Sequence, residues 1–227
     1  MKILCVDTSS TAGSVVLAED SKILGEVNLD SSLTHTSRLL TSVQYILDNV
    51  ELTVNSIDAF SVISGPGSFT GIRIGLATVK GLAEMLSKPI LAVTTFEAWA
   101  QKASKWEGIL IPLIDARRNE VYARVFECHD SHLVQRKPDW VGKPENFLQT
   151  LDVENILFLG DGAVKYDVLI RSQGLPNWKI AKTDFFLGRS LLSIVNSKEC
   201  PNKWSKPEEV GPYYLRKSDA ETKWRSR

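Results

Sequence analysis

The chain has 227 residues, of which 43% are hydrophobic and 24% charged, and its 27 basic residues balance its 27 acidic ones. This length and apolar content suit one large or two small globular domains with real cores, and they exclude a disordered chain. The charge balance excludes a protein that binds nucleic acid over its whole surface. No apolar run approaches the roughly 20 residues that span a bilayer.

The cysteines and the start of the chain indicate where the protein works. Cys5, Cys128 and Cys200 lie far apart and form no C-x-x-C pair, and Cys5 lies inside an apolar run, where a cysteine is typically a small buried hydrophobe. Only Ile3 to Val6 separate the first two residues from Asp7, too few for the core of a signal peptide. We therefore expect a soluble, reduced, cytoplasmic protein without membrane association.

The first half of the chain alternates strands and helices. Apolar runs predict strands over residues 2–7, 13–19, 22–30, 58–64 and 89–93. Apolar residues at helical spacing predict a helix over 39–50, another from the glycine-rich turn to about residue 86, and a third from about residue 95. The predicted order is β-β-β-α-β-α-β-α.

The second half repeats part of this pattern. A strand over 109–115 ends in Asp115, and a polar turn leads to a strand over 120–127, much as the first strand ends in Asp7 before the next begins. This echo, 108 residues apart, hints at an internal duplication. A strand over 156–159 and helices near 144–151, 163–172 and 187–197 follow. We predict α/β domains over 1–105 and 106–204, with 205–227 as a candidate to pack back on the first.

The most informative segment is GPGSFTGIRIG, residues 65–75, which joins a buried strand to a helix. The first amides and the positive dipole end of such a helix can hold an anion, but the glycine spacing matches neither named nucleotide fingerprint. A phosphate cradle and a tight structural turn therefore both stay open. Asp7 could likewise hold a magnesium-bound phosphate or cap turn amides. The residues expected near a nucleotide or phosphate are Asp7, Thr8, Gly65, Gly67 and Ser68.

The helix after this turn has one face of small residues, Gly71, Gly75, Thr78 and Gly81. Each helical glycine costs about 1 kcal/mol relative to alanine, so we expect another backbone to approach this face closely. Packing within the chain and contact with another chain are equally open interpretations.

Catalytic sets are missing from the sequence. The three histidines, His35, His129 and His132, form no H-x-x-x-H pair, no cysteine completes a zinc set, and no serine lies in a nucleophile elbow. We expect neither catalytic residues nor a metal site. The tail, 216–227, has five basic and two acidic residues and is open to two interpretations, a solvated end or a contact with RNA or a partner.

Four segments together resemble one protein family. KILCVDTSS (2–10), GPGSFTGIRIG (65–75), PILAVTTFEAWA (89–100) and PYYLR (212–216) are similar to the bacterial tRNA threonylcarbamoyladenosine biosynthesis proteins of the TsaB family, also called YeaZ. The resemblance covers the first 100 residues and the ending well, and the second half loosely. It implies an actin/sugar-kinase/Hsp70-like ATPase fold of two β-β-β-α-β-α-β-α-type domains, the second reduced.

The resemblance also implies a role in modifying adenosine 37 of tRNAs that read codons starting with A. There, TsaB-like proteins are partners of a transferase paralogue, TsaD, and an ATPase, TsaE, joins them. Where the paralogue has the metal-binding pattern H-x-E-x-H, this chain has Thr95, Glu97 and Trp99, and neither threonine nor indole replaces an imidazole ligand. We expect a noncatalytic activator without its own cofactor, with ATP or ADP bound at most at the level of the complex and tRNA contacted indirectly.

The resemblance further implies dimers through helices of the first domain, with a second copy or with the paralogue. Arg73 could then pair with a partner carboxylate. The expected interface residues are Leu39, Leu40, Val43, Gly71, Arg73, Gly75 and Thr78.

Two other functions stay open. One is a stand-alone ATP-dependent phosphotransferase with Asp7 and the Gly65–Gly71 loop around the phosphates, although Gly160-Asp161-Gly162 is the only candidate glycine motif in the second half. The other is a peptidase, against which the missing metal ligands and nucleophile count.

Overall fold

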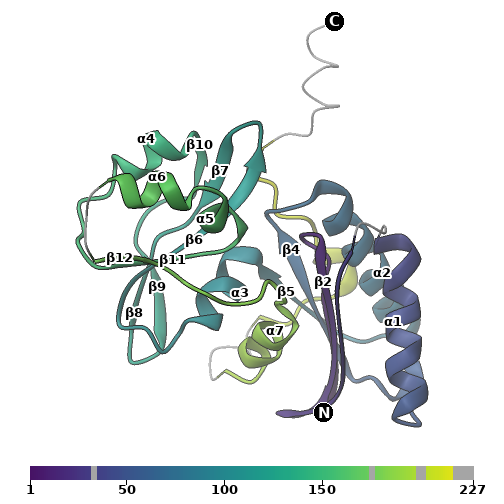
Figure 1. Ribbon diagram of the computed structural model, residues 1–227. Coiled ribbons are helices and arrows are strands. Elements are labelled where there is room, and N and C mark those ends of the chain that lie inside the picture. Colours follow the sequence, from purple (N-terminus) through teal and green to yellow (C-terminus); the bar gives the residue numbers. More distant parts are fainter. Residues whose placement is uncertain (32–34, 174–176, 198–202, 217–227) are drawn as a thin grey trace, which may run out of the picture. The chain divides into compact units, whose positions relative to one another are not determined.

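The computed structural model describes residues 1–31, 35–173, 177–197 and 203–216, and it divides into two compact units. Unit 1 comprises Met1–Ala98 and Phe186–Tyr213; unit 2 comprises Trp99–Phe185 and Tyr214–Arg227, with Arg216 as its last described residue. Each unit is built on a sheet with helices against it (Figure 1). None of the helices in the described ranges combines the length and the apolarity that a bilayer crossing requires.

Unit 1 contains a five-stranded sheet in the order β3-β2-β1-β4-β5. β1 pairs antiparallel with β2 and parallel with β4, and β5 extends the parallel side. Because β1 and β4 are buried along almost their whole length, they read as continuous apolar runs. The strands are β1 (Lys2–Asp7), β2 (Ala12–Glu19), β3 (Lys22–Asp30), β4 (Ala59–Gly65) and β5 (Ile90–Thr94).

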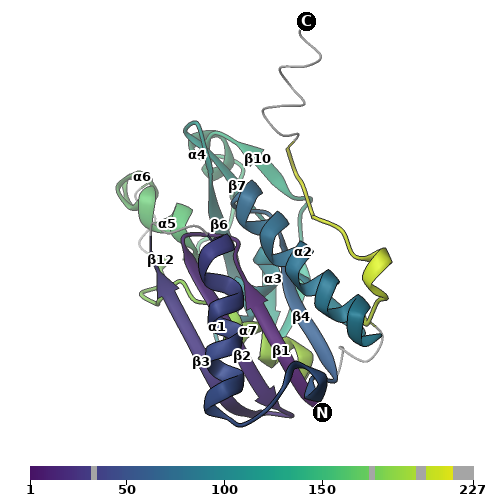
Figure 2. The ribbon, with the colours of Figure 1, turned by 90° about the vertical axis from the view of Figure 1, so that its right-hand side faces the viewer.

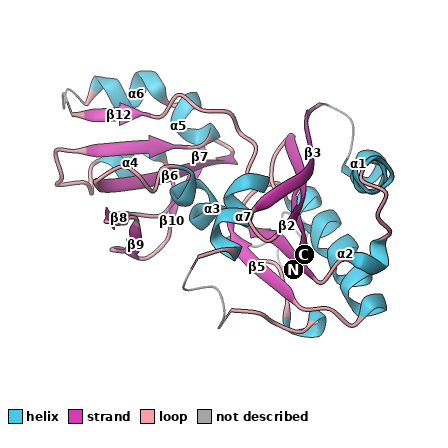
Figure 3. Ribbon diagram, turned by 90° about the horizontal axis from the view of Figure 1, so that it is seen from below, coloured by secondary structure: helices cyan, strands magenta, loops and turns pink. Residues whose placement is uncertain are grey.

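Helices cover both faces of this sheet. α1 and α2 lie side by side on one face (Figure 2), and their apolar residues form the core of the unit with that face. α7 packs on the opposite face (Figure 3), against β1, β2 and β4. The helical elements are α1 (His35–Asn49), α2 (Phe69–Leu86), α7 (Gly188–Val195) and the 3₁₀ turns η1 (Val54–Ser56) and η3 (Pro207–Glu209). α3 (Thr95–Lys102) begins in unit 1 and ends in unit 2.

Unit 2 contains a seven-stranded sheet around the long strand β6. β6 pairs antiparallel with β7 and β8 and parallel with β11, and thus repeats the surroundings of β1, which has an antiparallel neighbour and a parallel one. The strands are β6 (Gly108–Arg117), β7 (Glu120–Ala123), β8 (Phe126–His129), β9 (His132–Gln135), β10 (Trp140–Gly142), β11 (Ile156–Leu159) and β12 (Trp178–Ile180). The helices are α4 (Pro144–Leu148), α5 (Asp161–Lys165) and α6 (Asp167–Ser172).

The structure confirms the predicted β-β-β-α-β-α-β-α order of the first half. In the second half two predicted elements are each divided in two. The strand predicted over 120–127 is β7 and β8, because β7 pairs with the end of β6 and β8 with its beginning. The helix predicted over 163–172 is α5 and α6, separated at Tyr166, whose φ of −106° and ψ of 25° leave the helical region.

The grouping of residues differs from the predicted domains of 1–105 and 106–204. The first compact segment ends at Ala98, and the described residues 186–197, predicted in the second domain, belong to unit 1. The reason is burial, since Leu191 and Val195 of α7 cover the open face of the five-stranded sheet. The described part of the candidate segment 205–227 divides as well, because residues up to Tyr213 join unit 1 and Tyr214 to Arg216 join unit 2.

Both described cysteines are buried, and Cys5 was expected to be so. Cys5 and Cys128 are free thiols, and burial raises the pKa of both. Cys200 lies outside the described residues.

Candidate functional site

The glycine-rich turn between β4 and α2 is tied closely to the turn that follows β1. A Cβ on Gly67 would lie 2.4 Å from the carbonyl oxygen of Ser9, and the amide of Ser68 donates to that same oxygen at 2.6 Å. Gly65 has a φ of 123°, and a Cβ there would lie 2.5 Å from the backbone oxygen of Tyr213. Both glycines are therefore needed because backbones of the same unit approach them.

The polar side chains at this turn also bond within the chain. Asp7 Oδ1 accepts hydrogen bonds from the amide and the hydroxyl of Ser9, at 2.8 and 2.7 Å. Thr8 Oγ1 donates to the carbonyl oxygen of Gly71 at 2.7 Å, and Ser68 Oγ accepts from the Gly71 amide at the start of α2 at 3.2 Å. The structure thus brings together all five residues predicted near a phosphate. The bonds that it shows for Asp7 and Ser68 are those of turn and helix caps.

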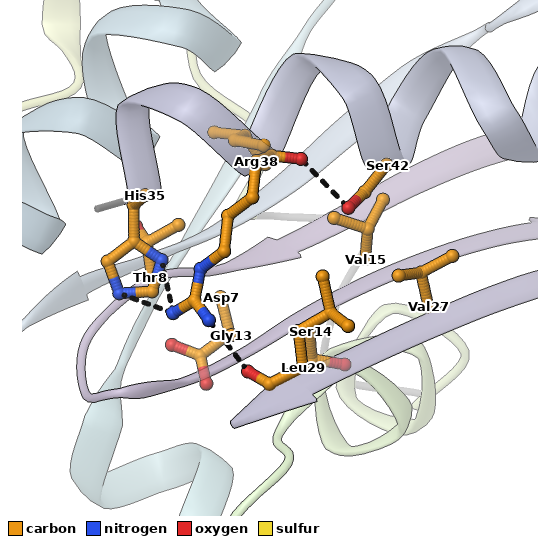
Figure 4. Close-up of a pocket in the computed structure, with 11 residues that line it drawn as sticks. Asp7, Thr8, Gly13, Ser14, Val15, Val27, Leu29, His35, Arg38 and Ser42 are labelled. Carbon is orange, nitrogen blue, oxygen red and sulfur yellow. Dashed lines mark hydrogen bonds between the residues drawn. The ribbon is translucent and has the colours of Figure 1, made fainter. Parts of the chain in front are cut away.

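A histidine and an arginine that sequence analysis did not connect lie beside this turn (Figure 4). Arg38 donates to the backbone oxygens of Thr11 at 2.6 Å and Leu29 at 3.1 Å, and its guanidinium lies 3.1 Å from His35 Nδ1. His35 Nε2 lies 2.6 Å from the carbonyl oxygen of Ser10. The i, i+3 spacing on α1 was a usable signal, because it places both side chains on one helix face.

The His35–Arg38 cluster holds nearby backbone oxygens by hydrogen bonds, and it leaves little space for a ligand. Burial first, and then the Arg38 guanidinium, lower the pKa of His35, while its bond to Ser10 acts in the opposite direction. The adjoining pocket, lined by Asp7, His35 and Arg38 among others, has room for about one water molecule. Arg38 therefore holds the β1–β2 turn and the end of β3 against α1.

The small-residue face of α2 packs against its own chain. A Cβ on Gly71 would lie 2.0 Å from the backbone oxygen of Thr8, and one on Gly75 would lie 2.3 Å from Thr8 Oγ1. Both glycines are buried, whereas Gly81 has nothing within 4 Å of such a Cβ. Of the two open interpretations, packing within the chain therefore holds for Gly71 and Gly75, and their place in an interface stays a prediction.

The other expected interface residues also fall into two groups. Leu39 and Val43 are 3% and 4% exposed and belong to the core of unit 1, whereas Leu40 is 56% exposed. Thr78 is half-buried, and Arg73 is exposed with its guanidinium 4.3 Å above the Phe69 ring.

An open groove runs along the outer side of α1 and α2. Leu40, Val43 and Tyr45 of α1 line it together with Val54 of η1 and Leu82 of α2. Tyr45 is 62% exposed, and Met85, one turn beyond Leu82 on α2, is 63% exposed. Tyr45, Leu82 and Met85 were not among the expected interface residues. Helical spacing shows which apolar residues share a helix face, but it does not show which of them the rest of the chain covers.

The segment from Thr94 to Trp99, which the resemblance compares with the paralogue's metal-binding pattern, packs within the chain. Thr95 Oγ1 donates to the carbonyl oxygen of Pro66 at 2.6 Å. Glu97 accepts hydrogen bonds from the amide and hydroxyl of Thr94, at 2.8 and 2.7 Å. Trp99 is 4% exposed and meets Phe185 edge to face, with ring centroids 5.8 Å apart. Within the described ranges, no group of three or more metal-binding side chains comes together.

The candidate glycine motif of unit 2 is also a packing contact. A Cβ on Gly160 or Gly162 would lie 2.6 or 2.7 Å from the carbonyl oxygen of Leu113 on β6. Asp161 accepts from the amides of Asp115 and Gly162 at 3.0 and 2.9 Å, and its burial raises its pKa. The motif thus fastens α5 to β6.

Comparison with known proteins places the chain in a family. The family model described as TsaD, tRNA N6-adenosine threonylcarbamoyltransferase, matches residues 22–174. The chain belongs to this family. A relative in Bacillus subtilis, named tRNA threonylcarbamoyladenosine biosynthesis protein TsaB, is 28% identical over 99% of this chain and 98% of its own.

Solved structures agree with this placement. YeaZ from Pseudomonas aeruginosa is 28% identical, with a TM-score of 0.78 over 94% of this chain and 99% of its own. The Lmo2764 protein of Listeria monocytogenes, a proposed N-acetylmannosamine kinase, is 12% identical with a TM-score of 0.50 over 86% of this chain and 97% of its own, which shows the fold alone. The chain is thus TsaB/YeaZ-like within its family, on the predicted actin/sugar-kinase/Hsp70-like fold.

Proposed function

We propose that the protein acts in tRNA threonylcarbamoyladenosine biosynthesis as a noncatalytic partner of a TsaD-like transferase. The observation that carries this proposal is the similarity to B. subtilis TsaB over nearly the full length of both chains. The substrate is then adenosine 37 of tRNAs that read codons starting with A, and the place of action is the cytoplasm, where these tRNAs are.

The β5–α3 segment supports the noncatalytic part of the proposal. The two positions aligned with metal-binding histidines are Thr95 and Trp99, which are 3% and 4% exposed. The threonine hydroxyl is engaged by the Pro66 oxygen, and an indole has no lone pair suited to a metal ion. The transfer chemistry would then be supplied by the paralogue.

The groove along α1 and α2 supports the partner role. Leu40 and Tyr45, which line the groove, each expose more than half of their surface, and so does Met85, one turn beyond the lining residue Leu82. Large exposed apolar side chains that gather in one place mark interaction sites. We propose that this face binds the transferase paralogue, and a second copy of the chain when the paralogue is absent. A TsaE-like ATPase would join this pair, and ATP or ADP would bind only at the level of the complex.

The central experiment is reconstituted tRNA threonylcarbamoylation with the cognate paralogue, the ATPase and the adenylate-forming enzyme. We expect product only when both this chain and the paralogue are present. If omission of this chain leaves the product unchanged, the partner role is wrong. ATP turnover by the chain alone would instead favour the phosphotransferase; the glycine turns at Gly65–Gly71 and Gly160–Gly162, which pack on their own backbone, count against it.

The groove is tested by placing charge on it. Full burial of a leucine side chain gives about 1.5–3 kcal/mol, and 56% of Leu40 is still exposed in the free chain. Leu40→Lys should therefore lower partner affinity about 4- to 17-fold. Val134→Lys is the matched control, because Val134 is 53% exposed on β9 in unit 2. Binding of the paralogue is measured by calorimetry and self-association by sedimentation. Equal effects of the two variants would contradict the assignment of the groove.

A further inference from the structure

The groove along α1 and α2 is acidic at the end where both helices finish. Asp48 lines the groove in the last turn of α1, and Glu51 follows it, exposed, with its amide donating to the Asp48 carbonyl oxygen at 3.4 Å. Glu84 is exposed in the last turn of α2, between the lining residue Leu82 and the exposed Met85. The three carboxylates, here called the acidic end, therefore lie beside the exposed apolar side chains of the groove.

Carboxylates at these positions do not help the helices to fold. The C-terminal end of a helix carries a partial negative charge, so basic side chains stabilise it and acidic ones destabilise it. Over α1 and α2, both described in full, no basic side chain lies in the last turn. Lys80 is one turn before Glu84, where it could form an i, i+4 ion pair, but its ammonium donates to the backbone oxygen of Val210 at 2.6 Å. Lys88, just beyond α2, lies 3.9 Å from Asp58 instead. Folding therefore does not explain the acidic end.

The charge of this face also bears on a second copy of the chain. The exposed basic side chain on the two helices is Arg73, near the start of α2. It is about 16 Å along the helix from Glu84, whereas charges in 0.15 M salt are screened beyond about 8 Å, so it does not compensate the acidic end. If two copies met through this face, six carboxylates would come together with two exposed guanidinium groups. A second copy is therefore a poorer electrostatic match than a basic partner.

We propose that the acidic end selects the partner of the groove by charge. It favours a helix of the transferase paralogue whose apolar residues are flanked by lysine or arginine, and it weakens binding of a second copy. This inference rests on the proposed function and adds the chemistry of the partner to it. A helix in an apolar groove contacts it with residues three or four apart, which leaves the flanks of that helix to meet Asp48 and Glu84. Apolar burial then supplies affinity, and the charges beside it supply the choice between partners.

The test compares two binding reactions of a full-length variant that carries both Asp48→Asn and Glu84→Gln. The amides keep the size of the carboxylates and remove their charge, and an oxygen remains to accept the 2.6 Å bond from Gln44 Nε2 to residue 48. Loss of two exposed ion pairs should lower the affinity for the paralogue about 2- to 30-fold, measured by calorimetry. Self-association, measured by sedimentation, should instead strengthen, because fewer carboxylates would come together. For the unaltered chain, raising NaCl from 50 to 500 mM should act in the same two directions.

The matched control carries Asp152→Asn and Glu154→Gln. These substitutions remove one aspartate and one glutamate charge from exposed positions of unit 2, and neither residue lines the groove. We expect the control to bind the paralogue and to self-associate like the unaltered chain. Unfolding in urea completes the comparison, because the variant at the acidic end should be at least as stable as the unaltered chain once the unfavourable charges at the two helix ends are removed.

Three outcomes would overturn the proposal. Equal affinities of variant and control for the paralogue would show that the carboxylates meet no basic partner. Weaker self-association of the variant would show that they serve a second copy as well. If the unaltered chain does not bind the paralogue, the partner role falls and this inference with it. If binding changes as expected but omission of the chain leaves threonylcarbamoylation unchanged, the choice of partner stands and the proposed function falls.

Discussion

Two glycines on α2 should respond in opposite directions to the same substitution. Gly71 and Gly81 both lie inside this 18-residue helix, where alanine is intrinsically favoured over glycine by about 1 kcal/mol. Their surroundings differ, because a Cβ at Gly71 would lie 2.0 Å from the backbone oxygen of Thr8 whereas one at Gly81 meets nothing within 4 Å. Gly81→Ala should therefore stabilise the protein and Gly71→Ala should destabilise it.

The magnitudes follow from the two surroundings. Gly81→Ala should raise the free energy of unfolding by about 0.5–1 kcal/mol, which is the propensity gain alone. At Gly71 the new methyl group forces a backbone to move, which costs about 1–3 kcal/mol and exceeds the propensity gain. We therefore expect Gly71→Ala to lower the free energy of unfolding by up to about 2.5 kcal/mol, the difference between these two effects.

A double-mutant cycle distinguishes the atoms responsible. A Cβ on Gly75 would meet Thr8 Oγ1 at 2.3 Å, and Thr8→Ala removes that oxygen. The effects of Gly75→Ala and Thr8→Ala should therefore be strongly non-additive, with the second substitution relieving the first. Gly71→Ala should not be relieved in this way, because its clash is with the backbone oxygen of Thr8, which no side-chain substitution removes.

Urea unfolding followed by circular dichroism measures all of these variants, and binding of the paralogue measured on the folded protein completes the comparison. A Gly71→Ala variant as stable as the unaltered chain, but unable to bind the paralogue, would refute packing within the chain and return this face to the interface. Equal stability changes at Gly71 and Gly81 would refute the close approach of Thr8.

Two further predictions concern buried charge. Arg124 donates to both carboxylate oxygens of Asp139, at 2.6 and 2.7 Å, and the two side chains are only 9% and 7% exposed. Because Asp139→Ala leaves a buried guanidinium without its carboxylate, it should lower the free energy of unfolding in urea titrations by about 3–5 kcal/mol, and a loss below 1 kcal/mol would contradict this. Burial, and then the charge of Arg38, lower the pKa of His35 in the folded chain. On acidification the unfolded chain therefore binds a proton at this histidine before the folded chain does, so the stability should fall as the pH drops below about 6.5. Unfolding measured from pH 7.5 to 5.5 should show a smaller loss for His35→Gln, and identical profiles would show that the histidine does not contribute.

Local sequence carried enough information for the first half of the fold. The continuous apolar runs of β1 and β4, the helical spacing in α1 and the short connections between the first strands each predicted the element that forms. Local patterns fail where tertiary pairing decides. The run over 120–127 looks like one strand, but β6 offers partners for β7 and β8 at different places along its length.

The candidate site shows the same division. The glycine motif identified the turn, and the sequence alone showed that Thr95 and Trp99 have side chains unsuited to binding a metal ion. Whether the small face of α2 serves the chain or a partner was undecidable from spacing, because a helix sequence reports which residues share a face but not what lies opposite. Only the position of Thr8 assigned Gly71 and Gly75 to the interior, and only the packing of α1 and α2 left Leu40 and Tyr45 exposed.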